Sequence, residues 1–169
     1  MTRTCVAAAL LTLGTATASL ADLHVSFRDG APKDTFRIVN NSGCATGPMT
    51  LSIDMTPSAG QLIFDVTSAG AGVEVFQPLE VTKGADFLNG RPDVLDGQKT
   101  LDLNIANLPG GAEIAFTIDV DDTMGAQEIT VNGSEMSGST VAATLAAMRV
   151  DATFDASAIA KIATPACTS

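Results

Sequence analysis

The stretch EIAFTIDVDDTMG, residues 113–125, decides the fold, because apolar and polar side chains alternate along it until it reaches three aspartates. Such alternation has the period of a β-strand that packs one face on a core and turns the other toward water. Asp119, Asp121 and Asp122 then either hold a metal ion or end the strand in solvent. The segment therefore predicts a strand and poses the question of a cation site.

The same pattern recurs at short spacing along the chain, with turn residues such as Asn41-Ser42-Gly43 and Pro109-Gly110-Gly111 between the repeats. Short, evenly spaced strands with such turns are typical of an all-β sandwich. We therefore expect an antiparallel, immunoglobulin-like β-sandwich of about eight to ten strands in a single domain. The expected strands are 23–27, 35–40, 49–55, 61–67, 73–81, 99–105, 113–120 and 127–133.

Alternation also assigns the core, since every second residue of a strand points to the same face. A register error of one residue would invert a whole strand. The predicted core residues are Val25, Phe27, Phe36, Ile38, Leu51, Ile53, Ile63, Val66, Leu101, Leu103, Ile114, Phe116, Ile118, Ile129 and Val131.

The segment 139–155 has two interpretations. Its alanines, leucine and methionine favour a helix capped by Ser139. However, residues 141–145 and 150–154 repeat one pattern, as two paired strands would. We prefer the hairpin, although residues 146–149 between the two repeats contain no glycine or asparagine and make a poor turn.

The first 21 residues, MTRTCVAAALLTLGTATASLA, have the features of a secretory signal peptide. A cationic start at Arg3 precedes an apolar run and small residues, which predicts cleavage after Ala21, with Ala18 as the alternative. The apolar run is too short to span a bilayer. We expect an exported domain, residues 22–169, without a membrane span, in the periplasm, at the cell surface or outside the cell.

The charge balance excludes some partners. Removal of Arg3 with the leader leaves 8 basic and 19 acidic side chains, a net charge of −11. Such a chain repels nucleic acid, so we expect no nucleic-acid partner. Cys44 and Cys167 remain after cleavage, and an even cysteine pair in an exported chain predicts a disulfide. The tail, 155–169, would add a short last strand that ends near Cys167.

The aspartates give a metal-site hypothesis. Calcium takes six to eight oxygen ligands, and Asp119, Asp121 and Asp122 offer clustered carboxylates. They lack the ligand spacing of a helix-loop-helix calcium site, and a solvated strand end is the alternative interpretation. Further ligands could come from Asp54, Asp65 or Glu128.

Signals for catalysis are weak. His24 is the only histidine, and alternation puts it on the polar face of its strand. No G-x-S-x-G motif is present, and the chain has no Trp or Tyr to stack on sugars. We therefore expect no enzymatic activity and, calcium aside, no cofactor. The longest expected loop, 79–97, interrupts the alternation, with Phe87 and Leu88 anchoring it to the core.

Three segments, 22–44, 61–81 and 112–138, resemble small exported bacterial proteins labelled aggregation factor core proteins. The strongest matches are IDVDDTMGAQEITV (118–131) and DVTSAGAGVEVFQP (65–78). The resemblance implies an exported protein with a role in adhesion, with calcium as an assisting ion. It implies no catalytic residue.

Together these observations favour a non-enzymatic exported interaction module, of the adhesion or aggregation type, whose partner is a protein or a cell-surface component. One alternative is a calcium-dependent binding module that uses the cluster Asp119 to Asp122. A second is a periplasmic enzyme without a recognised motif, whose pocket would lie near His24 or the 79–97 loop.

Overall fold

The computed structural model describes residues 21–68, 72, 76–124, 131–146 and 148–164. These residues form eleven strands and one short 3-10 helix, η1 (Ala85–Phe87). The strands are β1 (Ala21–Arg28), β2 (Asp34–Asn40), β3 (Met49–Asp54), β4 (Ile63–Phe64), β5 (Glu80–Lys83), β6 (Thr100–Ile105), β7 (Glu113–Ile118), β8 (Val120–Asp121), β9 (Thr140–Leu145), β10 (Met148–Thr153) and β11 (Ile159–Thr164).

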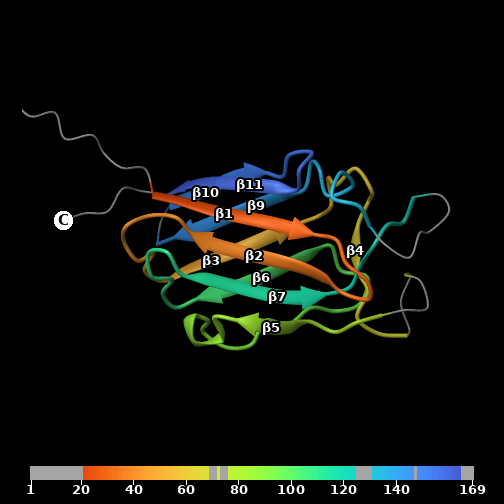
Figure 1. Cartoon of the computed structure of the whole chain (residues 1–169), viewed down its shortest axis with the longest axis horizontal. Helices are drawn as coiled ribbons and strands as arrows, with labels where there is room; N and C mark the ends of the chain where they lie inside the picture. The colour runs from red at the N-terminus through yellow and green to blue at the C-terminus, as the bar shows by residue number, and fades with distance from the viewer. Residues whose placement is uncertain (1–20, 69–71, 73–75, 125–130, 147, 165–169) are drawn as a thin grey trace, which may run out of the picture.

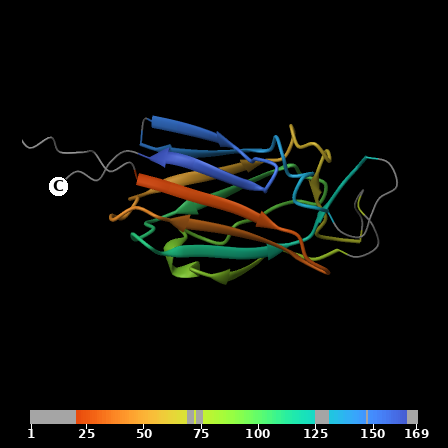
Figure 2. The ribbon, with the colours of Figure 1, turned by 45° about the horizontal axis from the view of Figure 1, so that its top comes forward.

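The strands form two antiparallel layers, so the predicted all-β sandwich is confirmed (Figure 1). One sheet has the order β11-β1-β2-β7-β5, and the other has the order β10-β9-β3-β6. Turning the molecule separates the two layers (Figure 2). A third, two-stranded sheet pairs β4 with β8 at one end of the sandwich.

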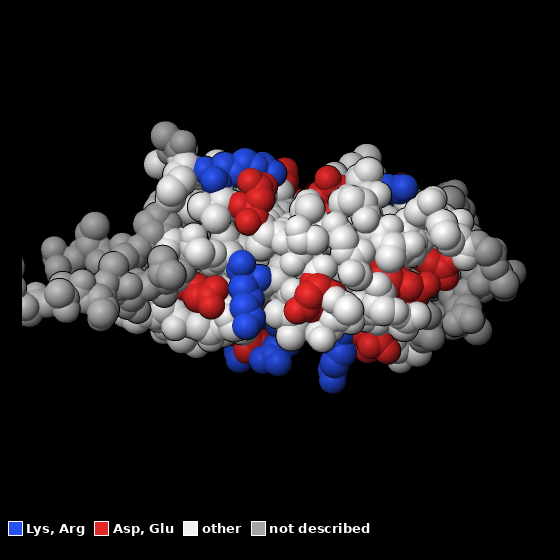
Figure 3. Space-filling model, turned by 90° about the horizontal axis from the view of Figure 1, so that it is seen from above, with Lys and Arg blue, Asp and Glu red and all other residues white. Residues whose placement is uncertain are grey.

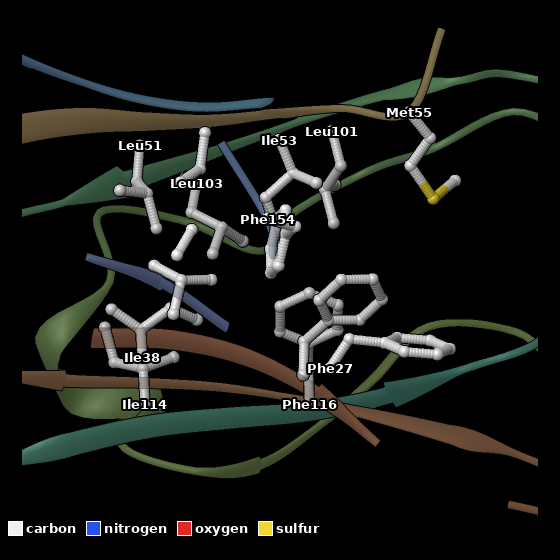
Figure 4. Close-up of a cluster of buried hydrophobic side chains, with 14 of the residues drawn as sticks. Phe27, Ile38, Leu51, Ile53, Met55, Leu101, Leu103, Ile114, Phe116 and Phe154 are labelled. Carbon is white, nitrogen blue, oxygen red and sulfur yellow. The ribbon is translucent and has the colours of Figure 1, made fainter. Parts of the chain in front are cut away.

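The core lies between the two layers and follows from the alternation of each strand. In β3 and β6 every second residue is buried, and the apolar side chains point toward those of β1, β2 and β7 (Figure 4). The Phe36 ring stacks on Phe116 with centroids 5.0 Å apart, and Phe27 lies 5.1 Å from Phe36. Among the predicted core residues in the described ranges, all are buried except Val66, which is partly buried, and Ile129 lies outside these ranges.

The hairpin interpretation of residues 139–155 is confirmed. β9 and β10 pair from Met148 opposite Leu145 to Thr153 opposite Thr140. β9 also pairs with β3, so its apolar side chains Val141 and Ala143 are fully buried. Burial of one face explains why a strand wins over the helix favoured by alanine propensity.

Several strand boundaries were wrong. The expected strand 61–67 is reduced to β4, and residues 131–133 at the end of the last expected strand are not in a strand. The expected strand 113–120 is divided at Asp119 into β7 and β8, which raises the strand count above ten. The division has a physical cause, because the Asp119 N–H donates to the Gln77 carbonyl instead of continuing the pairing of β7 with β2.

The expected loop 79–97 contains the edge strand β5 and η1. Phe87 and Leu88 pack partly buried against the core, as predicted. Backbone hydrogen bonds from Asn89 to Asn104 and from Ala106 to Phe87 hold the segment against β6. The loop is therefore a fixed part of the surface along the open edge of the sandwich.

Acidic and basic side chains are interspersed in small groups on the face seen from above, without one broad basic patch (Figure 3). Within the described ranges, none of the helical structure has the length and apolar character needed to cross a bilayer.

Candidate functional site: an acidic end and a groove beside Arg91

The small β4-β8 sheet brings the aspartates of two distant segments together. Ile63 pairs with Asp121, and Phe64 pairs with Val120. Asp65 follows β4, and its N–H donates to the carbonyl of Asp119 at 3.1 Å. The two segments are thereby held side by side at one end of the sandwich.

The predicted aspartates are buried and do not form a solvated strand end. Relative exposure is 6% for Asp119, 1% for Asp121 and 3% for Asp122, and Asp34 and Asp65 are buried to the same degree. Burying a carboxylate is costly unless it is paired, hydrogen-bonded or protonated. Each of these five buried acids therefore needs an ionic partner, hydrogen bonds or a proton.

Asp65 and Asp121 lie against each other beneath Gly72. A Cβ built on Gly72 would be 2.2 Å from Asp121 Oδ2 and 2.3 Å from Asp65 Oδ2. Any side chain at this position would collide with both carboxyl groups, so only glycine allows the backbone to approach the pair this closely. The two oxygens are close enough for one ion to contact both.

The charge on Asp65 is poorly compensated. Neither of its side-chain oxygens accepts a hydrogen bond from an N–H or hydroxyl group. Burial raises the pKa of Asp65, and the neighbouring carboxyl groups of Asp121 and Asp96 raise it further.

Asp96 behaves differently from Asp65. Burial opposes its ionisation, but its Oδ1 accepts hydrogen bonds from the N–H groups of Val66 and Thr67 at 2.8 and 2.9 Å. These bonds outweigh burial and lower the pKa of Asp96. Asp96 therefore fixes the chain that follows Asp65 and keeps a negative charge beside it.

Asp119 and Asp34 extend the acidic end toward β2. Burial, followed by repulsion from Asp121, raises the pKa of Asp119 to about 7. Burial also raises the pKa of Asp34 to about 8, although its carboxylate accepts hydrogen bonds from Gly30 and Val120. Three of the five buried acids, Asp34, Asp65 and Asp119, thus have a pKa raised to about 7 or 8.

The remaining predicted ligands lie elsewhere or have local partners. Asp122 accepts a hydrogen bond from the Met124 N–H, and Asp54 accepts one from the Thr56 N–H, so each caps its own turn. Glu128 lies outside the described residues. In the described ranges, no three or more His, Cys, Asp or Glu side chains are arranged to hold a metal ion, the trio Asp119, Asp121 and Asp122 included.

His24 lies on β1 with a local partner. Its Nε2 is 2.8 Å from Asp22 Oδ2, two residues earlier on the same strand face, and both side chains are about one-third exposed. The contact is one between neighbours on a polar strand face, as the alternation predicts.

Of the two cysteines in the predicted disulfide, Cys44 lies within the described residues and Cys167 lies outside them. Cys44 lies in the segment that follows β2. The first residue of that segment, Asn41, donates its N–H to the Asp22 carbonyl at the start of β1. The last residue of β11, Thr164, pairs with Ala21 at the same end of β1. The chain toward Cys167 therefore leaves the sandwich at the end where Cys44 lies.

A second candidate site is a surface groove along the 79–97 segment. Three adjoining hollows of about 480, 440 and 260 Å³ share Arg91 and Pro92 in their walls. We call this surface the Arg91 groove. The apolar residues that line it are Val66, Pro78, Leu79, Val81, Ala85, Leu88, Pro92 and Val94.

Arg91 is the basic side chain common to all three hollows. Within the described ranges it makes no ion pair, whereas Lys33, Arg37 and Lys83 pair with Glu80 or Glu113. Sequence reasoning selected this segment but missed Arg91. It also gave Gly72 no role, because only the fold brings a glycine against two distant carboxylates.

Comparisons with known proteins give no relative: no family model, no curated protein and no solved structure matches this chain. The function therefore has to be argued from the two sites themselves.

Proposed function

We propose that this chain is an exported, non-enzymatic interaction module that binds an extended, carboxylate-bearing segment of a partner protein in the Arg91 groove. Export follows from the leader predicted in residues 1–21. The single observation that supports the binding site is the set of hollows that share Arg91, an exposed cation without an ion-pair partner in the described part of an acidic chain.

The chemistry of the groove favours a peptide over a sugar. Two of its three hollows are lined largely by aliphatic and proline side chains, with Glu80 or Asp93 beside Arg91, and the whole chain has no Trp or Tyr for stacking on sugar rings. Apolar contacts with a small number of charged or polar groups that fix orientation are typical of peptide recognition.

The test selects peptides from a random phage-displayed library for binding to the purified chain without the predicted leader. Fluorescence polarisation then measures each selected peptide against wild type, Arg91→Glu and Arg28→Glu. Arg28 is an exposed arginine at the end of β1 and serves as the matched control.

We expect the selected peptides to carry an Asp, a Glu or a required terminal carboxylate. Arg91→Glu should weaken their binding at least about tenfold, equivalent to ~1.4 kcal/mol, and Arg28→Glu should leave it unchanged. Equal binding to wild type and Arg91→Glu would refute the groove as the binding site.

A further inference from the structure

We propose that Asp65 and Asp121 form a calcium site closed by the backbone of Gly72. The inference does not depend on the Arg91 groove or on its partner. It differs from the sequence hypothesis in its ligands. Asp65, which follows β4 and was there only one of three possible further ligands, is here the main partner of Asp121 in place of Asp119 and Asp122.

The first support is the state of Asp65. Its side chain is 1% exposed, and neither oxygen accepts a hydrogen bond from an N–H or hydroxyl group. The carboxyl groups of Asp121 and Asp96 lie within hydrogen-bond reach of Asp65, and both repel its negative charge. In the described part of the chain, no Lys, Arg or His forms an ion pair with it. One proton offsets one negative charge in this group of acids, whereas a divalent cation offsets two.

The second support is the spacing of the pair. Asp65 Oδ2 and Asp121 Oδ2 both lie within 2.3 Å of the Cβ position of Gly72, so their separation is less than two calcium–oxygen bonds of about 2.3–2.6 Å. One cation can therefore bind both oxygens without moving either strand. Asp65 offers two oxygens and Asp121 offers Oδ2 to such an ion, and Asp96 lies against Asp65 as a further acidic neighbour.

The third support concerns the choice of metal. The Gly72 backbone covers the pair, which leaves little space for a hydrated ion. Magnesium gives up its waters reluctantly and demands a small octahedral site, whereas calcium accepts flexible sets of carboxylate and carbonyl oxygens. The buried pair thus fits calcium better than magnesium.

The experiment measures thermal unfolding by far-UV circular dichroism with calcium, with magnesium and with excess chelator at matched ionic strength. Circular dichroism is chosen because the chain has no Trp or Tyr for fluorescence. Native mass spectrometry counts the bound calcium. The variants are Asp65→Asn, Asp121→Asn and Gly72→Ala, with Asp102→Asn, an exposed aspartate of β6, as the control.

We expect calcium to raise the midpoint of wild type and Asp102→Asn by several degrees and to bind as one ion per chain. Both effects should be absent in Asp65→Asn and Asp121→Asn. In chelator, Asp65→Asn should be at least as stable as wild type, because it removes a buried charge without a partner. Gly72→Ala retains both carboxylates but blocks their approach, and should lose calcium binding.

Two results would overturn the proposal. One is no calcium response in wild type together with a more stable Asp65→Asn, which would mean that the pair shares a proton. The other is a calcium response that persists in Asp65→Asn, which would place the ion elsewhere. An equal response to magnesium would overturn the assignment to calcium.

Discussion

Single residues carry the electrostatic character of this protein, and Asp34 is the clearest example. Its carboxylate accepts two backbone hydrogen bonds, which favour the ionised form, yet burial outweighs them and raises its pKa to about 8. Repulsion from Asp119 and Asp29 acts in the same direction as burial. Folding therefore favours the protonated acid.

The sign of the resulting pH dependence follows from linkage. Between its usual pKa of 3.8 and about 8, Asp34 holds a proton in the folded state that it has lost in the unfolded state. Its contribution to the free energy of unfolding therefore falls as pH rises through this window, by up to about 1.4 kcal/mol per pH unit, and is constant above it.

We predict that Asp34→Asn flattens this dependence. Urea unfolding at a series of pH values should show a smaller loss of stability toward alkaline pH than in wild type, while Asp102→Asn should follow wild type. The amide also loses one of the two hydrogen bonds, so the variant should be less stable by about 1 kcal/mol at low pH. Identical slopes for Asp34→Asn and wild type would show that Asp34 stays ionised when folded.

At the scale of elements, the β9–β10 hairpin shows how packing overrides local preference. Its turn begins at Ala146, which has a φ of 48°, a left-handed conformation that costs a non-glycine residue about 1–2 kcal/mol. The pairing of β9 with both β3 and β10 compensates for that strain. The turn is therefore a weak point imposed by two well-packed strands.

We predict that Ala146→Gly stabilises the protein by up to about 1 kcal/mol, because glycine adopts this conformation without a steric penalty. Chemical denaturation would measure the change. The comparison is Ala106→Gly, an exposed alanine without a positive φ, which should be neutral or destabilising. Equal destabilisation by both changes would contradict the strain argument.

At the scale of the whole molecule, the segment after β2 and the end of β11 both lie beside the start of β1. Asn41 bonds to Asp22, and Thr164 pairs with Ala21, so the segments that lead to Cys44 and toward Cys167 leave from one place. A disulfide there would close a loop of more than a hundred residues, which the chain-entropy model values at about 4–5 kcal/mol.

We predict a Cys44–Cys167 disulfide in the protein made through the proposed export route. Peptide mapping by mass spectrometry without reductant should find the two cysteine peptides linked, and reduction should lower the thermal midpoint. Cleavage of the predicted leader would remove Cys5 and so prevent a competing pair. Complete alkylation of both thiols before reduction would show that the bridge does not form.

Much of the architecture could be predicted from the sequence because alternation with period two is a local signal that reflects burial of one strand face. It identified the sandwich, the buried residues of β1, β2, β3, β6 and β7, and the β9–β10 hairpin. Alternation predicted the wrong extent for the segments of β4 and β8. Each of these strands pairs over only two residues, within longer stretches that the pattern assigned to one strand.

The candidate sites depended on contacts that no local pattern records. The sequence alone determined that Asp119, Asp121 and Asp122 follow a strand and that the 79–97 segment interrupts the alternation. Only the tertiary structure decided that Asp121 faces Asp65 beneath Gly72 and that Arg91 lies in a groove. The physical reason is that burial and charge repulsion depend on which distant segments the fold brings together, whereas strand alternation depends only on neighbours in the chain.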